Sequence, residues 1–184
     1  MKKIQLPLTN EIIQNCHAGD AVLLSGEIYT ARDAAHKRLV ALMDQNEPLP
    51  FDLKGAVIYY AGPCPKKPGQ IINSCGPTTS GRMDKYAPRT LERGLKGFIG
   101  KGPLARAVID AMKRQVAVYF IATGGAGALI AQCVTKAEPI AFEDLGAEAI
   151  LRLTVKDLPV IVGIDCYGEN LYEIGPKSCR EAGK

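Results

Sequence analysis

The segment Gly76-Pro77-Thr78-Thr79-Ser80-Gly81-Arg82-Met83-Asp84 concentrates groups that suit a small anion. It places a turn, three adjacent hydroxyl side chains and an arginine within nine residues. Backbone N–H groups, hydroxyls and a bidentate guanidinium at one point are typical of a carboxylate site. The other interpretation is a polar loop that leads into a helix, with Arg82 on a solvated face.

A second cation lies where a helix dipole opposes it. Thr30-Ala31-Arg32-Asp33 resembles a capping box and predicts a helix start, which puts Arg32 in the first turn. Asp33 can offset this charge, or Arg32 and the free N–H groups of the turn can share an anionic ligand. His36, one turn further on, either faces the same ligand or is simply hydrogen-bonded.

Lys101 repeats this arrangement later in the chain. It stands between Gly100 and Gly102 in a predicted tight turn, and Pro103 suits the first position of a following helix. The sequence therefore predicts another cation beside a helix start.

Apolar periodicity predicts the elements that must position these side chains. Strands are expected over 21–25, 56–61, 98–99, 116–122, 140–142, 149–155 and 160–165, and helices over 9–15, 30–45, 103–114 and 127–135. The buried stripe of the second helix is expected to contain Ala35, Leu39, Leu42 and Met43. Strands mixed with short, uneven helices predict an α/β fold with layered β/β/α architecture, as a single domain over 1–184.

A glycine loop, Gly124-Gly125-Ala126-Gly127, follows the apolar run 116–122. Strand, glycine loop and helix in this order invite a dinucleotide-binding interpretation, but the third glycine of that fingerprint falls on Ile130. Tight packing of the helix is the alternative that we favour for these small residues.

Charge and composition narrow the class of partner. The net charge is +4, and seven cations lie between Arg82 and Arg106 against only two acids. Only Tyr86 and Phe98 are interleaved with them, and the chain has no tryptophan, so stacking on nucleic-acid bases is not indicated. A solvated basic surface or a pocket for an acidic metabolite are the remaining interpretations.

The N-terminal sequence and the cysteine spacing predict a cytoplasmic protein whose cysteines are free thiols. Residues 1–8 lack the apolar core of a signal peptide, and the run 116–122 is too short to span a bilayer, so no membrane association is expected. The six cysteines are Cys16, Cys64, Cys75, Cys133, Cys166 and Cys179. None forms a C-x-x-C pair, which argues against a self-contained metal site, and only Cys64 and Cys75 flank one loop.

Several motifs occur in the order found in one known family. They are Ala21-Val22-Leu23-Leu24-Ser25-Gly26, Thr30-Ala31-Arg32-Asp33-Ala34-Ala35-His36-Lys37-Arg38, Gly62-Pro63, the segment 76–84 and Phe142-Glu143-Asp144-Leu145-Gly146. The chain, from about Leu6 to Pro176, resembles the C-terminal domain or separate β subunit of class I fumarate hydratases and tartrate dehydratases.

This resemblance implies a fold, a cofactor and a partner. The fold would be the swivelling β/β/α domain of iron–sulfur hydro-lyases. A separate α subunit would carry the three cysteines of a [4Fe–4S] cluster, and this chain would bind no cluster itself. The chain would then be inactive alone and would form one wall of a shared dicarboxylate site within a higher hetero-oligomer.

The resemblance also assigns roles to residues. Arg32, Arg82 and Lys101 would bind substrate carboxylates, and Thr78 would act in proton transfer. Thr79 either binds substrate or caps the helix, and His36 is kept as a candidate beside Arg32. The short, compact chain favours a fumarate hydratase β subunit. An L-tartrate dehydratase β subunit and a non-catalytic anion-binding domain are the alternatives.

Overall fold

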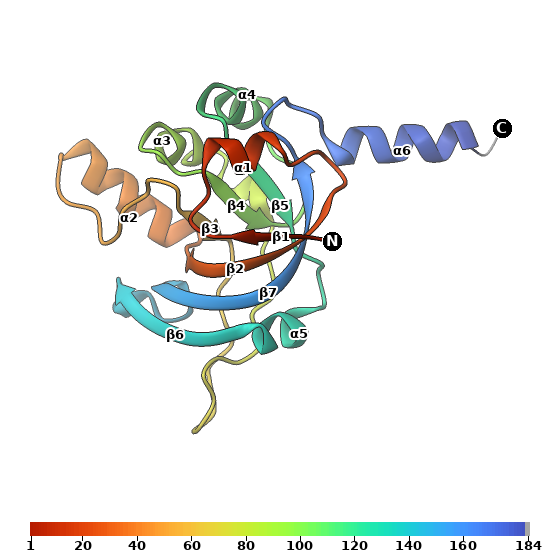
Figure 1. Ribbon diagram of the computed structural model, residues 1–184. Coiled ribbons are helices and arrows are strands. Elements are labelled where there is room, and N and C mark those ends of the chain that lie inside the picture. The colour runs from red at the N-terminus through yellow and green to blue at the C-terminus, as the bar shows by residue number, and fades with distance from the viewer. Residues whose placement is uncertain (183–184) are drawn as a thin grey trace.

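The computed structural model describes residues 1–182, and seven strands form one mixed sheet (Figure 1). The strands are β1 (Lys2–Gln5), β2 (Ala21–Thr30), β3 (Val57–Tyr59), β4 (Gly97–Gly100), β5 (Val118–Ile121), β6 (Val134–Ala141) and β7 (Ile150–Ile164). Their order is β1-β2-β3-β4-β5-β7-β6, and an additional β2–β7 pairing joins the sheet to itself. The strands β2, β3, β4, β5 and β7 therefore form a closed ring, with β1 and β6 attached to it.

Helices cover the outside of this ring. They are α1 (Asn10–Gln14), α2 (Asp33–Asp44), α3 (Ala87–Glu92), α4 (Arg106–Gln115), α5 (Gly127–Gln132) and α6 (Leu171–Ala182), with two 3-10 segments, η1 (Ser80–Met83) and η2 (Glu143–Glu148). Helices α2, α3 and α4 lie on one side of the sheet, and α6 projects from the body (Figure 1). No helix in residues 1–182 is both long and apolar enough to cross a membrane.

Side-chain alternation along the strands divides the core into two clusters. On β3, Val57 and Tyr59 join a cluster with α1 and β7, whereas Ile58 joins a second cluster with α2, α3 and α4. Successive side chains of a strand point to opposite faces, so β3 and β4, which are buried along their whole length, contribute to both clusters. The layered α/β class predicted from the sequence is confirmed.

One edge of the ring collects the loops that follow the parallel strands. Strands β1 to β5 run parallel to one another, and β7 runs antiparallel to β2 and β5. The carboxyl ends of β2 to β5 and the first residue of β7 therefore meet at the same edge. In open α/β sheets this is where ligands bind.

Several of the predicted strands have different bounds in the structure; the strand expected over 140–142, for example, is the end of β6, which begins at Val134. β2 does not turn at Gly26 but continues to Thr30, because a register irregularity accommodates the Gly26 φ of +125°. The separate strands predicted over 149–155 and 160–165 are one 15-residue strand, β7. Asp157, at φ +49°, stays within it and donates its N–H to Ser25 Oγ over 2.9 Å.

Two predicted helices have different bounds in the structure, and one helix was missed. Helix α4 begins at Arg106 rather than at Pro103, so Lys101 lies outside its first turn. Helix α5 ends at Gln132, because the residues from Val134 onward pair with β7 as β6. Helix α6 was not predicted at all.

Candidate active site

Five of the predicted site residues lie at the common edge of the parallel strands. Arg32 follows β2, Lys101 follows β4, and the segment with Thr78, Thr79 and Arg82 lies beside the end of β3. The Thr78 N–H donates to the Tyr60 carbonyl over 2.7 Å, which fixes this segment to the strand. Residues from three separate parts of the chain therefore meet at one edge.

The segment 78–82 is also joined directly to the Lys101 turn. Thr79 forms a parallel bridge with Lys101, and the Ser80 N–H donates to the Lys101 carbonyl over 2.9 Å. The Thr79 and Lys101 side chains are both exposed. Lys101 also borders the glycine loop, because a Cβ on Gly124 would lie 3.8 Å from the Lys101 ammonium.

Arg32 and Arg82 share one carboxylate. Asp33 Oδ2 lies 3.8 Å from Arg32 Nη2 and 3.8 Å from Arg82 Nη1. Both distances exceed those of a hydrogen bond, so these contacts restrain the guanidinium groups weakly. Arg82 is 55% exposed and Arg32 is 24% exposed, so Arg82 is the more accessible of the two.

Glu148 is a functional candidate that the sequence analysis missed. It precedes β7, and its Oε1 lies 3.2 Å from Arg32 Nη2, while its Oε2 accepts the Ala34 N–H over 3.1 Å. Glu148 therefore caps the start of α2, where Arg32 is the N-cap residue and makes no side-chain cap. The predicted capping box was wrong, because the cap comes from a residue more than one hundred positions away.

The Thr30 hydroxyl instead holds the end of η2. It donates to the Ala149 carbonyl over 3.3 Å and accepts the Leu151 N–H over 3.0 Å. Asp144, in the motif 142–146, accepts from Arg38 on α2 over 2.7 Å. This motif therefore brings Glu148 to Arg32.

Close backbone packing surrounds Arg32. A Cβ on Gly62 would lie 3.2 Å from Arg32 Cδ and 2.8 Å from the Ala147 carbonyl, so a larger residue there would displace the arginine. Arg32 Nε is buried and has no hydrogen-bond partner within residues 1–182. Its guanidinium therefore keeps an unsatisfied donor at this edge.

His36 lies beneath this edge rather than on it. The ring is 0% exposed, packs against Tyr60 and Tyr86, and lies with Nδ1 2.9 Å from the Arg32 carbonyl. Donation from Nδ1 to that carbonyl leaves Nε2 as an acceptor without a partner in the described residues. Burial lowers the pKa of His36 to about 4, although the Arg32 carbonyl and Asp33 favour the protonated form. Because the His36 side chain is fully buried, we interpret it as a support for the Arg32 backbone rather than as a group that binds substrate.

The glycine loop serves packing in this structure. A Cβ on Gly127 would lie 2.5 Å from Ser74 Oγ and 2.9 Å from the Gly76 nitrogen, and the Cys75 N–H donates to the Gly127 carbonyl over 3.0 Å. The small residues thus allow α5 to pack closely against the segment that leads into Thr78.

The five cysteines whose side chains are described do not form a ligand set for a cluster. Cys16, Cys64, Cys75, Cys133 and Cys166 are free, and the side chain of Cys179 lies outside the described ones. No group of three or more His, Cys, Asp or Glu side chains within residues 1–182 is arranged to hold a metal ion. Burial raises the pKa of Cys75 to about 12, which disfavours the thiolate that ligation requires.

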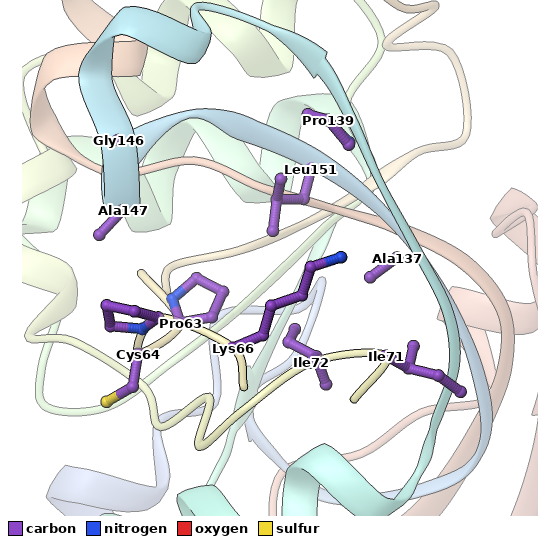
Figure 2. Close-up of a pocket in the computed structure, with 11 residues that line it drawn as sticks. Pro63, Cys64, Lys66, Ile71, Ile72, Ala137, Pro139, Gly146, Ala147 and Leu151 are labelled. Atoms are coloured by element: carbon purple, nitrogen blue, oxygen red, sulfur yellow. The ribbon is translucent and has the colours of Figure 1, made fainter. Parts of the chain in front are cut away.

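A mainly apolar pocket of about 400 Å³ lies beside the Arg32 edge (Figure 2). Its lining includes Pro63, Ile72 and Leu151, with Lys66 extending among them. Ala147 also lines the pocket, and its carbonyl packs close to Gly62. The pocket is thus continuous with the packing around Arg32 but is formed by different side chains.

Comparison with known proteins assigns this arrangement to a family. The family model described as the fumarase C-terminus matches residues 1–175. The chain belongs to the fumarase C-terminal family. This confirms the resemblance inferred from the motifs, and the edge described above is built from those same motifs.

Relatives of the fumarase C-terminal chain occur as subunits and as parts of longer proteins. It is 37% identical over 172 residues to the putative L(+)-tartrate dehydratase subunit beta of Methanocaldococcus jannaschii, covering 90% of this chain and 88% of that protein. It is 36% identical over 177 residues to the L(+)-tartrate dehydratase subunit beta of Escherichia coli K12, covering 93% and 87%. It is also 36% identical over 183 residues to the putative fumarate hydratase class I of Geobacillus stearothermophilus, covering 97% of this chain but 35% of that protein.

Two facts follow for the fumarase C-terminal chain. The relatives are named as hydratases and dehydratases, so the family is one of hydro-lyases. The chain spans nearly the full length of the named beta subunits but only about 35% of the fumarate hydratase, so further protein belongs to that enzyme.

Proposed function

We propose that this chain is the β subunit of a two-chain hydro-lyase for a four-carbon hydroxy-dicarboxylate, with malate–fumarate interconversion as the leading reaction. The supporting observation is the convergence of Arg32, Arg82 and Lys101 with Thr78 at one edge of the ring. Malate is the smallest substrate that uses all of these groups, because it has two carboxylates, one hydroxyl and one removable C–H proton.

The three cations suit the charge that develops in dehydration. A proton leaves the carbon beside a carboxylate, so negative charge grows on that carboxylate as the neighbouring hydroxyl departs. Arg82 can bind a carboxylate through two parallel hydrogen bonds, and Lys101 supplies a compact positive charge. A dianionic substrate can replace the weak 3.8 Å contacts of Asp33.

Thr78 is proposed to take part in proton transfer. Its main chain is fixed to β3, and its side chain is partly exposed, which lets the hydroxyl reach a substrate at the edge. A threonine hydroxyl is a weak base, so it requires a second group for activation. We place that group on the partner chain.

An α subunit is proposed to complete the site. The named beta subunits among the relatives support such a partner, and the cysteines with described side chains are not arranged to hold a cluster. In this proposal a [4Fe–4S] cluster belongs to the α subunit, where it supplies Lewis-acid activation of the hydroxyl. The whole complex would be a cytoplasmic hetero-oligomer.

Tartrate is the second candidate substrate. Two relatives of matching length are named L(+)-tartrate dehydratase beta subunits. We expected the short chain to favour fumarate hydratase, and these names do not support that expectation. Tartrate carries one more hydroxyl than malate, and one extra hydrogen-bonding side chain can decide between them.

Anaerobic co-expression with the adjacent reading frame, followed by parallel assays of malate and tartrate, tests this function. Turnover of malate only when both chains are present is the expected result. A preference for tartrate would move the assignment to the second candidate. An iron-loaded complex that turns over neither acid would contradict the substrate class, and dicarboxylate binding by the isolated chain without any complex would favour a non-catalytic anion-binding domain.

A further inference from the structure

We infer that Tyr119 is a positioning residue, whose hydroxyl fixes the turn that carries Lys101 against the segment that carries Thr78 and Arg82. This inference rests on the proposed function. Tyr119 lies on β5, is 0% exposed and contacts neither of the exposed cations through a hydrogen bond in the described structure.

The hydroxyl of Tyr119 joins the two segments. It donates to the Gly102 carbonyl over 2.9 Å, and its oxygen lies 2.9 Å from Ser80 Oγ. Since the single Tyr119 proton is used toward Gly102, Ser80 Oγ must be the donor in the other bond. Burial raises the pKa of Tyr119, which keeps this proton on the hydroxyl. One buried oxygen therefore links residue 80 to residue 102.

Further contacts hold the same turn. The Gly102 N–H donates to Tyr172 Oη on α6 over 2.7 Å, and the Ala105 N–H donates to Asp84 Oδ2 over 2.8 Å. A Cβ on Gly100 would lie 2.0 Å from Ser80 Oγ, so only glycine permits this approach. Tyr119 lies at the centre of the arrangement because its single hydroxyl bonds both the segment, at Ser80, and the turn, at Gly102.

We call the pair of hydrogen bonds from Tyr119 to Ser80 and Gly102 the clamp. It matters because the Lys101 side chain is long and exposed. Its ammonium is carried on a flexible stem, so its location depends on the backbone from which it extends. A misplacement of about 1 Å in a positioning group can reduce a rate by about 10²-fold. A fixed distance between the Lys101 turn and the Thr78 segment would therefore set the spacing of the charges that hold two carboxylates.

The test is a double-mutant cycle in the assembled two-chain enzyme. Tyr119→Phe removes the hydroxyl and keeps the ring, so we expect kcat/KM for the better acid to fall about tenfold in the native background. In the Lys101→Met background the same change should cost less than twofold, because the group that the clamp positions is absent. Equal losses in both backgrounds would overturn the inference, as would no loss in the native background.

Tyr60→Phe is the matched control. Tyr60 is also fully buried, and its hydroxyl has no hydrogen-bond partner in the described residues. Any effect of this variant should be equal in the two Lys101 backgrounds. If Tyr60→Phe shows the same background dependence as Tyr119→Phe, the clamp is not the cause and the inference fails.

Hydrogen exchange in the full chain tests the clamp without an assay of activity. Tyr119→Phe should speed exchange of the Ser80 and Gly102 amides severalfold, whereas Tyr60→Phe should not. Unchanged exchange in Tyr119→Phe would overturn the inference. The proposed function fails separately: the native complex would then turn over neither malate nor tartrate, whereas the effect of Tyr119→Phe on amide exchange would remain.

Discussion

At the scale of single residues, the two arginines of the site differ in how firmly they are held. Arg32 is packed against Gly62 and paired with Glu148 at 3.2 Å, whereas Arg82 has an exposed guanidinium with Asp33 at 3.8 Å. The first is part of the local structure, and the second is free to exchange Asp33 for a ligand. Removal of Arg82 should therefore separate function from stability.

Arg82→Met is expected to lower kcat/KM of the assembled enzyme by about 10²-fold or more, because a charge-assisted carboxylate contact is lost. The melting temperature should change by less than about 1 °C, since no core contact is removed. Arg89→Met is the control. Arg89 pairs with Asp44 at 2.7 Å on the surface, and its loss should leave turnover unchanged. Full activity of Arg82→Met would remove Arg82 from the site.

His36 predicts a dependence of stability on pH. Its pKa in the folded protein is about 4, below the ordinary value of 6.5, because burial disfavours the charged ring. The unfolded chain therefore binds a proton first as the pH falls. Stability that is complete above pH 6.5 is lost as the pH falls toward 4, by on the order of 3 kcal/mol.

Thermal unfolding between pH 7 and pH 4 measures this effect. His36→Gln should reduce the fall in melting temperature across that range, because one titrating group is removed. His17→Gln, at the exposed second histidine, should retain the native slope. An unchanged slope in His36→Gln would show that other groups cause the acid sensitivity.

At the scale of elements, η2 is as important to the site as the helix that it caps. Asp144 fixes η2 to Arg38, and Thr30 fixes the residue after Glu148, so the carboxylate of Glu148 arrives at α2 already oriented. The start of α2 and the position of Arg32 thus depend on a segment near the other end of the chain.

Glu148→Ala should weaken both the fold and the site. Loss of the hydrogen bond to the Ala34 N–H and of the Arg32 pair is expected to cost about 1 kcal/mol, which corresponds to a melting temperature lower by about 3 °C. We expect KM for the substrate to rise severalfold as Arg32 loses its restraint.

Glu138→Ala serves as the comparison for Glu148→Ala. Glu138 pairs with Lys136 and Arg152 on the exposed part of β6, so its removal should change stability by only a few tenths of a kcal/mol and leave KM unaltered. If the two variants behave alike, the position of Glu148 has no special role.

Short sequence signals correctly predicted elements that are fixed by hydrogen bonds between residues close in the sequence. The helix predicted over 9–15 is present as α1, and the Thr9 hydroxyl caps it by accepting the Ile12 N–H over 3.3 Å. Predictions failed where a distant partner decides the outcome. Pro103 carries a helix-start signal, but α4 starts at Arg106, where Asp84 accepts the Ala105 N–H just before it.

The same distinction applies to the site. The residue types and spacing of 76–84 and the cations at 32 and 101 were visible in the sequence, and the structure brings them to one edge; anion binding there stays a prediction. The argument from the helix dipole does not apply to Lys101, because that residue precedes α4 by five positions. Glu148 and Tyr119 carry no local signal, since each acts through contacts with residues far away in the sequence.

At the scale of the whole molecule, the proposal predicts that iron does not depend on the cysteines of this chain. Cys75→Ala and Cys64→Ala should each leave the iron-to-protein ratio of the anaerobic complex within about 10% of the native ratio, because a buried neutral thiol and an isolated exposed thiol make poor ligands. Iron analysis together with the visible absorption spectrum measures this. Loss of iron in either variant would place a ligand on this chain.

The β2–β7 pairing has a consequence for biosynthesis. Thr30 and Ala149 are 119 residues apart, yet their contact forms part of the site edge. While the chain is being synthesised, β2 lacks one of its partner strands until β7 has left the ribosome. During that interval the nascent chain presents unpaired strand edges, the form in which it is most prone to aggregate and most dependent on chaperones. The proposed dicarboxylate site can therefore form only after the first and last strands of the ring have met.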